Sequence, residues 1–421
     1  MSTKGSYDSR DIYAEISIPL LADVPGFQEL NIDYAYRATS YSQFDSESVD
    51  RTAIKWKPIN DITIRATDST SYKAPTISDL YFGGGGGFPT YVDPCEQNQY
   101  GTYTDAQKAT ALAQCAAEGI DATTFSTENN QILELEVGNP NLTPEAGKNQ
   151  TYGIVWEPTS IEFLENIDFK MAVDKFEMEI ANAVVGSGVA ATLNGCYVNG
   201  NSAQCALIER SYGGDITSVR TANLNSAAID LFKGTDFSFN MTFEDVAMIG
   251  GSIEVDLIGT HFEENVTVTA TGISEDVVGD CYNFGESCFN RDRVNLAVRW
   301  RNEDWNVGVS TRYLSEIPVQ DGVVDYFSAD GGAYGEGTYT QAQLDDIYDA
   351  YSIPDITYTY LNVGYRNSDS VQLTLAVSNL FDKEPPYYKD FFGFVDPQIQ
   401  TPQNTYDIIG RYFQVGFKLT L

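Results

Sequence analysis

The sequence predicts an all-β fold, a transmembrane, antiparallel, up-and-down β-barrel with long extracellular loops and short periplasmic turns. Three observations support this prediction. Apolar and polar residues alternate with period two along the chain, aromatic residues make up 13% of it, and long polar connections alternate with short ones. We count about 14 alternating segments, each long enough for a tilted strand to cross a hydrocarbon layer.

The predicted strands are apolar at every second position. The apolar positions are Ile12/Ala14/Ile16/Ile18, Leu30/Ile32/Tyr34/Tyr36/Ala38, Ile62/Ile64/Ala66, Ile167/Phe169/Met171/Val173, Ile253/Val255/Leu257, Val294/Leu296/Val298/Trp300 and Val371/Leu373/Leu375/Val377. In a barrel these faces contact lipid, while the intervening positions face the lumen and tolerate charge. Six aromatic residues near strand ends are expected in the interfacial girdles: Trp56, Trp156, Trp300, Trp305, Tyr313 and Tyr365.

The connections between these strands are of two kinds. Pro58–Asp61, Asn302–Asp304 and Asn367–Asp369 fit tight turns. The long connections are Ala74–Gly147, Val184–Thr221, Asn265–Asn290, Ser315–Ile353 and Phe381–Thr405. Long loops at one end and short turns at the other are typical of outer-membrane barrels. For any single strand a soluble all-β protein is the better explanation, but it does not require loops of such different length at its two ends.

The charge of the chain narrows its possible partners. It has 25 Lys and Arg residues against 60 Asp and Glu residues, which gives a formal net charge of −35. Nucleic-acid binding needs a basic surface, so that class of function is excluded. The chain as written shows no signal-peptide apolar region and no apolar stretch long enough for a membrane helix.

Six cysteines fall into three local pairs, each in a polar segment. We predict the disulfides Cys95–Cys115, Cys196–Cys205 and Cys281–Cys288, with other connectivities left open, and hence an oxidising compartment. A zinc site is less favoured, because no C-x-x-C motif is present and the one histidine, His261, is distant in sequence from every cysteine.

Two local motifs lie in the first long connection. The glycine run Gly83–Gly87 is not followed by a Gly-Lys-Ser/Thr sequence, so it is interpreted as a flexible loop tip and not as a phosphate-binding loop. Thr104–Gly119 predicts a helix with Thr104 as its N-cap, held to Cys95 through Cys115.

No catalytic or metal site can be assembled from the sequence. One histidine cannot form a multi-histidine metal site, and His261 is interpreted as a girdle or lumen residue. The segment Ser315–Ser352 is rich in Asp and Glu; calcium binding is conceivable there, but a solvated acidic loop is favoured because regular ligand spacing is missing. We therefore expect no enzyme activity, no metal and no cofactor.

Several motifs, in order along nearly the whole chain, resemble those of TonB-dependent outer-membrane receptors. They are Trp56-Lys57-Pro58, Ile64-Arg65-Ala66, Ser71-Tyr72-Lys73-Ala74-Pro75 with Asp79-Leu80-Tyr81, Asp93-Pro94-Cys95, Gly138–Glu145, Val377–Pro386, Tyr406-Asp407 and Gly410–Phe413. The resemblance implies a barrel of roughly 22 strands in the outer membrane of a Gram-negative bacterium, filled by an N-terminal plug that carries a TonB box. Neither plug nor box is found, so residues 1–421 are expected to be the C-terminal part of such a barrel.

The resemblance also implies a function, which is TonB-dependent uptake of a scarce solute. The expected partners are outer-membrane lipid, a small solute such as an oligosaccharide or a metal chelate, and the TonB complex only through the plug. We favour an oligosaccharide, because the loops are rich in Tyr, Phe, Asn and Asp but poor in Lys and Arg. The alternatives are a porin-like or structural barrel without a plug, and a secreted β-rich glycan-binding module.

Exposed aromatic residues of the long loops are the candidate ligand contacts. They are Tyr81, Phe82, Tyr91, Tyr326, Tyr334, Tyr387, Tyr388, Phe391 and Phe392, with Phe327, Tyr339 and Phe394 in the same loops. Such rings either stack on a solute or pack on each other, and the sequence leaves both interpretations open.

Overall fold

The computed structural model describes residues 2–96, 104–127, 130–158, 167–226, 228–246, 249–268, 274–282, 287–319, 339–367, 371–387 and 401–419. Its largest element is one antiparallel sheet of 13 long strands in chain order. These strands are β1 (Ser9–Val24), β2 (Phe27–Tyr41), β3 (Glu47–Ile59), β4 (Ile62–Lys73), β7 (Glu145–Trp156), β8 (Ile167–Ala181), β12 (Asp230–Phe243), β13 (Ser252–Val268), β17 (Asp292–Arg301), β18 (Trp305–Leu314), β19 (Ile356–Arg366), β20 (Val371–Ser378) and β21 (Tyr412–Leu419). The short strand β14 (Ser274–Asp276) pairs with the end of β13.

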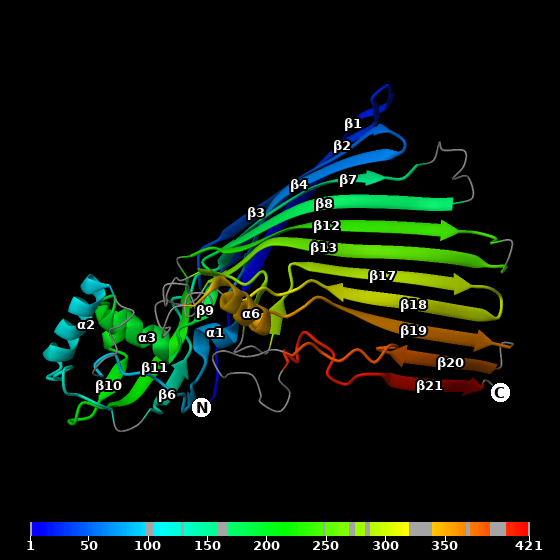
Figure 1. Cartoon of the computed structure of the whole chain (residues 1–421). Helices are drawn as coiled ribbons and strands as arrows, with labels where there is room; N and C mark the ends of the chain where they lie inside the picture. The colour runs from blue at the N-terminus through cyan, green and yellow to red at the C-terminus, as the bar shows by residue number, and fades with distance from the viewer. Residues whose placement is uncertain are drawn as a thin grey trace.

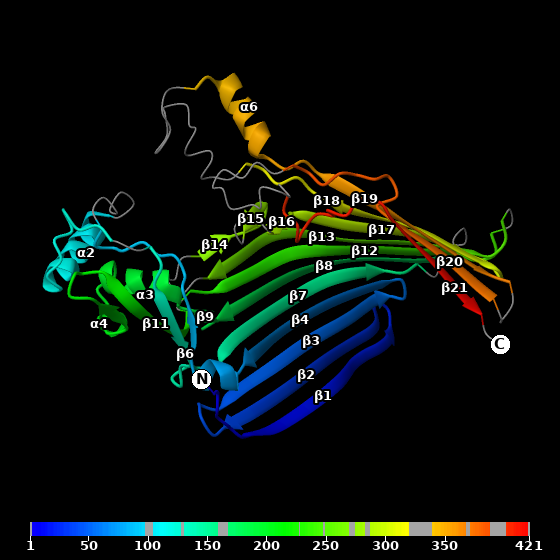
Figure 2. The same cartoon turned by 90° about the horizontal axis from the view of Figure 1, so that it is seen from below.

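The sheet curves strongly, as Figures 1 and 2 show, with β1 along one edge and β21 along the other. Each strand runs antiparallel to the next, so the chain meanders up and down across the sheet. The predicted up-and-down topology and all-β class are therefore confirmed. No helix among the described residues is long and apolar enough to cross a membrane.

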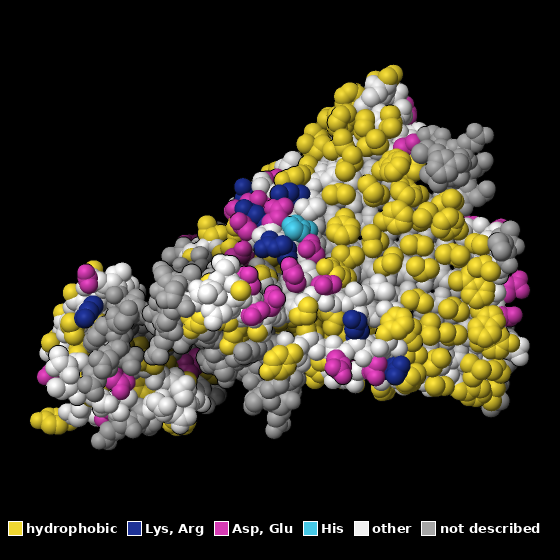
Figure 3. Space-filling view, in the orientation of Figure 1, with side chains coloured by type: hydrophobic (Ala, Val, Ile, Leu, Met, Phe, Trp, Pro, Cys, Tyr) yellow, Lys and Arg dark blue, Asp and Glu magenta, His cyan; other side chains and the backbone are white. Residues whose placement is uncertain are grey.

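The strand register separates an apolar outer face from a polar inner face. Leu296 lies opposite Leu257 on one side and Thr311 on the other, and Val298 lies between Val255 and Val309. Because directly paired residues share a face, the alternating apolar positions of all 13 strands merge into one band. Figure 3 shows this band as the wide hydrophobic surface over the strands.

All four tryptophans lie at the short-turn end of the sheet. The indole nitrogen of Trp56 donates to the carbonyl of Gly26 at 2.9 Å, and that of Trp300 donates to Gly250 at 2.9 Å. Both acceptors lie in turns, so the polar edge of each ring is tied to the margin of the sheet while the ring body faces outward. Tyr365 stacks beside Trp305 at 4.6 Å, whereas Tyr313 lies at the opposite end of β18, so the six predicted girdle residues divide between two margins.

A charged belt borders the apolar band on the long-loop side, and it is visible in Figure 3 around the one histidine. Lys175 pairs with Glu263 at 2.8 Å, Lys233 lies between Glu177 and Glu264, and the Nδ1 atom of His261 lies 2.7 Å from Asp292. These side chains follow the outward register of β8, β12, β13 and β17, so His261 belongs to the margin of the band and not to the lumen.

The long connections contain the remaining elements. They are α1 (Ile77–Tyr81), β5 (Gly85–Gly87), α2 (Asp105–Ala117), β6 (Leu133–Val137), β9 (Val184–Gly186), α3 (Gly188–Tyr197), α4 (Ser202–Cys205), β10 (Ile208–Arg210), β11 (Ile216–Asn225), β15 (Asp280–Tyr282), β16 (Ser287–Phe289) and α6 (Gln341–Tyr351). The helix predicted at Thr104–Gly119 is confirmed as α2, with Thr104 accepting a hydrogen bond from the backbone of Gln107.

One sequence interpretation of the loops is wrong. Gly85–Gly87 is not a flexible tip but the edge strand β5, in which Gly86 pairs with Leu135 of β6. Glycine can pair in this way because strand pairing uses backbone groups alone. The absence of side chains also lets Gly83, at the start of the run, pass close to the backbone of Ser2. Part of the acidic segment Ser315–Ser352 is the helix α6, which begins with a capping box formed by Thr340 and Gln343.

Candidate ligand-binding site

Two long connections, 74–144 and 182–229, fold together at the long-loop end of the sheet (Figures 1 and 2). We call their described residues the loop domain. Its five-stranded sheet has the order β10-β11-β6-β5, with β9 paired to β11. The parallel pairing of β11 with β6 joins one connection to the other, with Val219 opposite Glu134. The domain therefore exists only when both connections fold.

The loop domain has a packed interior that contains two disulfides. Cys95–Cys115 ties the segment before α2 to that helix, and Cys196–Cys205 ties α3 to α4. The third disulfide, Cys281–Cys288, joins β15 to β16 in a separate cluster with Tyr358 and Tyr406. All three nearest-neighbour pairings predicted from the sequence are confirmed by the structure.

We expect peptide mapping under non-reducing conditions to recover these three cross-links from the protein purified from outer membranes. Each cross-link closes a short loop and, in the loop-entropy description, contributes about 2–4 kcal/mol to ordering of its segment. A fully alkylated sample, with six free thiols, would contradict the assignment.

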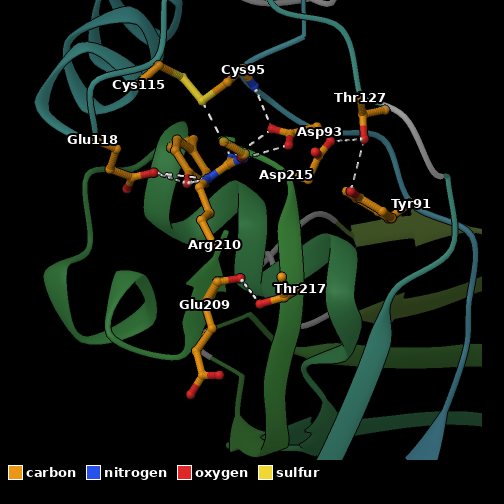
Figure 4. A network of polar contacts seen from close by, with 12 residues as sticks. Tyr91, Asp93, Cys95, Cys115, Glu118, Thr127, Glu209, Arg210, Asp215 and Thr217 are labelled. Carbon is orange, nitrogen blue, oxygen red and sulfur yellow. Dashed lines mark hydrogen bonds and ion pairs between the residues drawn. A yellow bond between two sulfur atoms is a disulfide. The ribbon is translucent and has the colours of Figure 1, made fainter. Parts of the chain in front are cut away.

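A buried arginine network holds the loop domain together (Figure 4). Arg210, at the end of β10, makes two ion-pair contacts of 2.7 Å with the carboxylate of Asp93, whose side chain is fully buried. The Nε atom of Arg210 lies 3.0 Å from Glu118 and donates to the Tyr197 hydroxyl at 2.9 Å, and its Nη1 atom donates to the carbonyl of Gly214. One guanidinium thus connects α2, α3, the Cys95 segment and the β10–β11 turn.

Burial and the charge of Asp93 shift the pKa of the Arg210 guanidinium in opposite directions. Burial works to lower the pKa of Arg210, but its hydrogen bonds and its attraction to Asp93 outweigh burial and hold that pKa above its usual value. Burial is also the largest cause of the raised pKa of Tyr197, which stays protonated and donates to Glu118 at 2.6 Å. Arg210 therefore stays charged and Tyr197 stays neutral at physiological pH.

The structure places the predicted ligand-binding residues in different surroundings. Tyr81 ends α1 and donates to Gln43 at 2.9 Å, and Phe82 follows it as the helix C-cap. Tyr91 is only 9% exposed and packs in the interior of the loop domain, as the packing alternative expects. Tyr387 is 60% exposed, in the connection after β20. Tyr326, Tyr334, Tyr388, Phe391 and Phe392, with Phe327 and Phe394, lie outside the described residues.

An aromatic cluster on the inner face was missed by the sequence analysis. Phe176, Phe232, Phe262 and Phe289 pack together near the long-loop end, and the guanidinium of Arg293 lies 4.3 Å from the ring centre of Phe289. The signal was a break in the alternation, because Phe176 takes a position of β8 that continues the polar series Asp168, Lys170 and Asp174.

Cross-strand ion pairs line the inner wall. Arg65 of β4 donates twice to Asp174 of β8, at 2.7 and 2.6 Å, across Gly153 of the intervening strand β7. A Cβ atom on Gly153 would overlap the Asp174 carboxylate, so this pair depends on glycine there. Further pairs are Arg37–Asp11, Lys55–Glu29 and Arg299 with Glu254 and Asp256. The lumen carries charge, as predicted, but much of its positive charge is neutralised locally.

A hollow of 840 Å³ lies against the inner wall near the short-turn end. Its polar lining includes Arg299, Arg301, Asn306, Asn362, Gln372 and Gln414. Ala297 pairs with Asp256 and Ser310 on the polar face, while its neighbour Leu296 pairs with Leu257 on the apolar face. Within the described part of the chain, no group of three or more His, Cys, Asp or Glu residues is arranged to hold a metal ion.

A family model described as TonB dependent receptor-like, beta-barrel matches residues 1–380. The chain belongs to this family. No curated protein sequence matches it.

Solved receptor barrels are similar to this TonB-dependent receptor barrel in fold. A point mutant of the ferric enterobactin receptor from Pseudomonas aeruginosa is 14% identical, with a TM-score of 0.57, over 98% of this chain and 45% of that one. The siderophore receptor PirA from Acinetobacter baumannii is 15% identical, with a TM-score of 0.56, over 98% and 46%. The chain thus spans less than half the length of these structures, and at such identity the likeness shows the fold alone.

Family membership sets the location of the barrel. TonB-dependent receptors are outer-membrane proteins of Gram-negative bacteria, and they are receptors and not enzymes, so both sequence expectations are confirmed. The apolar band consequently contacts lipid, the long-loop end is extracellular, and the short turns are periplasmic. The loop domain and the aromatic cluster both lie at the extracellular mouth.

Proposed function

We propose that residues 1–421 form the C-terminal part of a receptor barrel that takes up a neutral, polyhydroxylated solute, such as an oligosaccharide, across the outer membrane. In this proposal the loop domain and the inner wall contact the solute, and the TonB complex supplies energy through a plug domain. Solute uptake agrees with the family of the barrel, and the ligand class rests on the charges of the mouth and lumen.

The observation that carries the ligand class is the pairing of cationic side chains with carboxylates. Arg210 is enclosed by Asp93 and Glu118, and Arg65 and Arg299 are bound to acidic neighbours on the inner wall. An anionic chelate would have to compete with these carboxylates in a chain of net charge −35. Sugar hydroxyls, in contrast, donate to carboxylates, and sugar rings stack on aromatic faces.

The ferric siderophore class is the competing candidate, since the solved neighbours carry siderophore names. A porin-like barrel is the other alternative within the membrane. Uptake assays on the full-length receptor in living cells separate the three. Our proposal expects accumulation of a labelled neutral oligosaccharide that stops when TonB is deleted. Accumulation of a ferric chelate alone would show that the solute is a ferric siderophore and not an oligosaccharide. Diffusion of solute that is unaffected by TonB would support the porin-like alternative.

Two aromatic residues of the connection after β20 test the stacking interpretation. Tyr387 stands exposed, and Phe391 was selected from the sequence in the same loop. We expect alanine at either position to weaken solute binding by about tenfold, which corresponds to about 1.4 kcal/mol for a lost aromatic contact. Affinities measured on folded receptor that match the wild type in both variants would assign these rings to loop packing.

A further inference from the structure

A cleft of 540 Å³ opens in the loop domain beside the arginine network. One wall is the turn Ser211–Gly214, which joins β10 to β11, and the other is the chain that follows α2 from Glu118 to Phe125. Arg210 connects the two walls, because it contacts Glu118 on one side and donates to the Gly214 carbonyl on the other. The width of the cleft is therefore fixed before any ligand arrives.

Further contacts hold each wall in place. Gly214 has a positive φ of 100° and lies against the ring of Phe125, so the turn approaches the opposite wall closely. The disulfide Cys95–Cys115 anchors α2 one turn before Glu118. Asp121 accepts hydrogen bonds from the backbone and the hydroxyl of Thr123, and these bonds keep the pKa of Asp121 below its usual value. A rigid site of this kind loses little conformational entropy when it binds.

The cleft combines an exposed ring with hydrogen-bond acceptors. Tyr212, at the tip of the turn, has a fully exposed side chain, so its ring is accessible to a ligand that enters the cleft. Ile120, Ile208 and Phe125 add apolar surface, while Asp121 and Glu118 supply carboxylate oxygens. The positive charge of Arg210 is already balanced by Asp93 and Glu118, so the cleft offers no net attraction to an anion.

We propose that this cleft is a carbohydrate-binding site on the extracellular surface, in which a neutral sugar ring stacks on Tyr212 and its hydroxyl groups donate to Asp121. The volume of 540 Å³ lies within the range of about 300–1,000 Å³ that is usual for small-molecule sites. The site captures a glycan outside the barrel. This inference rests on the proposed function only for the class of ligand, because a cleft can capture a glycan whether or not the barrel transports it.

Binding of labelled neutral tetrasaccharides (maltotetraose, cellotetraose and mannotetraose) to purified full-length receptor tests the site. We expect at least one of the tetrasaccharides to bind. Tyr212→Ala should weaken the affinity for that sugar tenfold or more. Tyr212→Phe should retain the affinity, because stacking needs the ring and not the hydroxyl. Phe88→Ala is the matched control, since Phe88 is an exposed ring of the same domain that does not line the cleft. Asp121→Asn should weaken the same sugar about threefold to tenfold, whereas Asp105→Asn, at the far end of α2, should not.

The outcomes separate this inference from the proposed function. Equal affinity of the wild type and Tyr212→Ala for every tetrasaccharide, or no binding of any of them, would overturn the site. Tyr212-dependent binding of a ferric chelate in place of sugar would overturn the ligand class. If sugars bind at Tyr212 but none accumulates in cells, the carbohydrate site in the cleft is supported and oligosaccharide uptake is contradicted. If oligosaccharide uptake is observed but does not depend on Tyr212, the proposed uptake is supported and the carbohydrate site in the cleft is contradicted.

Discussion

Replacing Arg210 with methionine should destabilise the loop domain by about 3–5 kcal/mol, the usual cost of removing one partner from a buried ion pair. The side chain of Arg210 is 9% exposed and that of Asp93 is fully buried, so water cannot replace the lost guanidinium. Asp93 would be left buried with no cation beside it, and Glu118 and Tyr197 would lose a shared donor.

Hydrogen exchange in the full-length receptor measures this effect locally. Amides of α2, β10 and β11 should exchange faster by a factor between about a hundred and several thousand, while amides of β17 and β18 in the barrel wall stay unchanged. Arg220→Met is the control, because Arg220 lies exposed on β11 of the same sheet. A surface arginine contributes less than about 1 kcal/mol.

A second substitution identifies the cause. If the cost arises from an isolated buried carboxylate, adding Asp93→Asn to Arg210→Met should recover part of the lost stability, because the uncompensated charge is removed. Exchange rates in Arg210→Met that match those in Arg220→Met would show that the network does not hold the domain together.

The barrel wall was predictable because its signal is local. One face of each strand contacts lipid, so the alternation at Leu30, Ile32 and Tyr34 predicts a barrel strand without reference to any other part of the chain. The helix α2 was predictable for the same reason, since Thr104 and Gln107 lie within one turn. The capping box at Thr340 carried a similar signal, but the acidic composition of its segment obscured it.

The loop domain was not predictable because its contacts join distant residues. Arg210 and Asp93 are 117 positions apart, and nothing near either residue marks it as half of a pair. Strand β5 becomes a strand only because β6 lies beside it, although its glycines have low strand propensity. Aromatic content alone suggested stacking surfaces, and it could not separate the buried ring of Tyr91 from the exposed rings of Tyr212 and Tyr387.

The assignment of the two faces of the sheet is tested by a pair of neighbouring substitutions in β17. Leu296 faces lipid between Leu257 and Thr311, whereas Ala297 faces the lumen at the polar hollow. Arginine at Leu296 should destabilise the barrel by about 2–4 kcal/mol if that position lies near the midplane, because its charge must enter hydrocarbon. Arginine at Ala297 reaches water in the lumen and should cost far less.

Reversible unfolding of the full-length receptor in lipid vesicles, followed by tryptophan fluorescence, gives the two free energies. All four tryptophans of residues 1–421 lie at the periplasmic margin, so their fluorescence reports on the barrel wall and not on the loop domain. Leu296→Ala separates the loss of a leucine from the gain of a charge, since it removes the side chain without adding a cation. Equal penalties for Leu296→Arg and Ala297→Arg would contradict the assignment of the lipid-facing and lumen-facing sides, because only one of the two charges is expected to meet hydrocarbon.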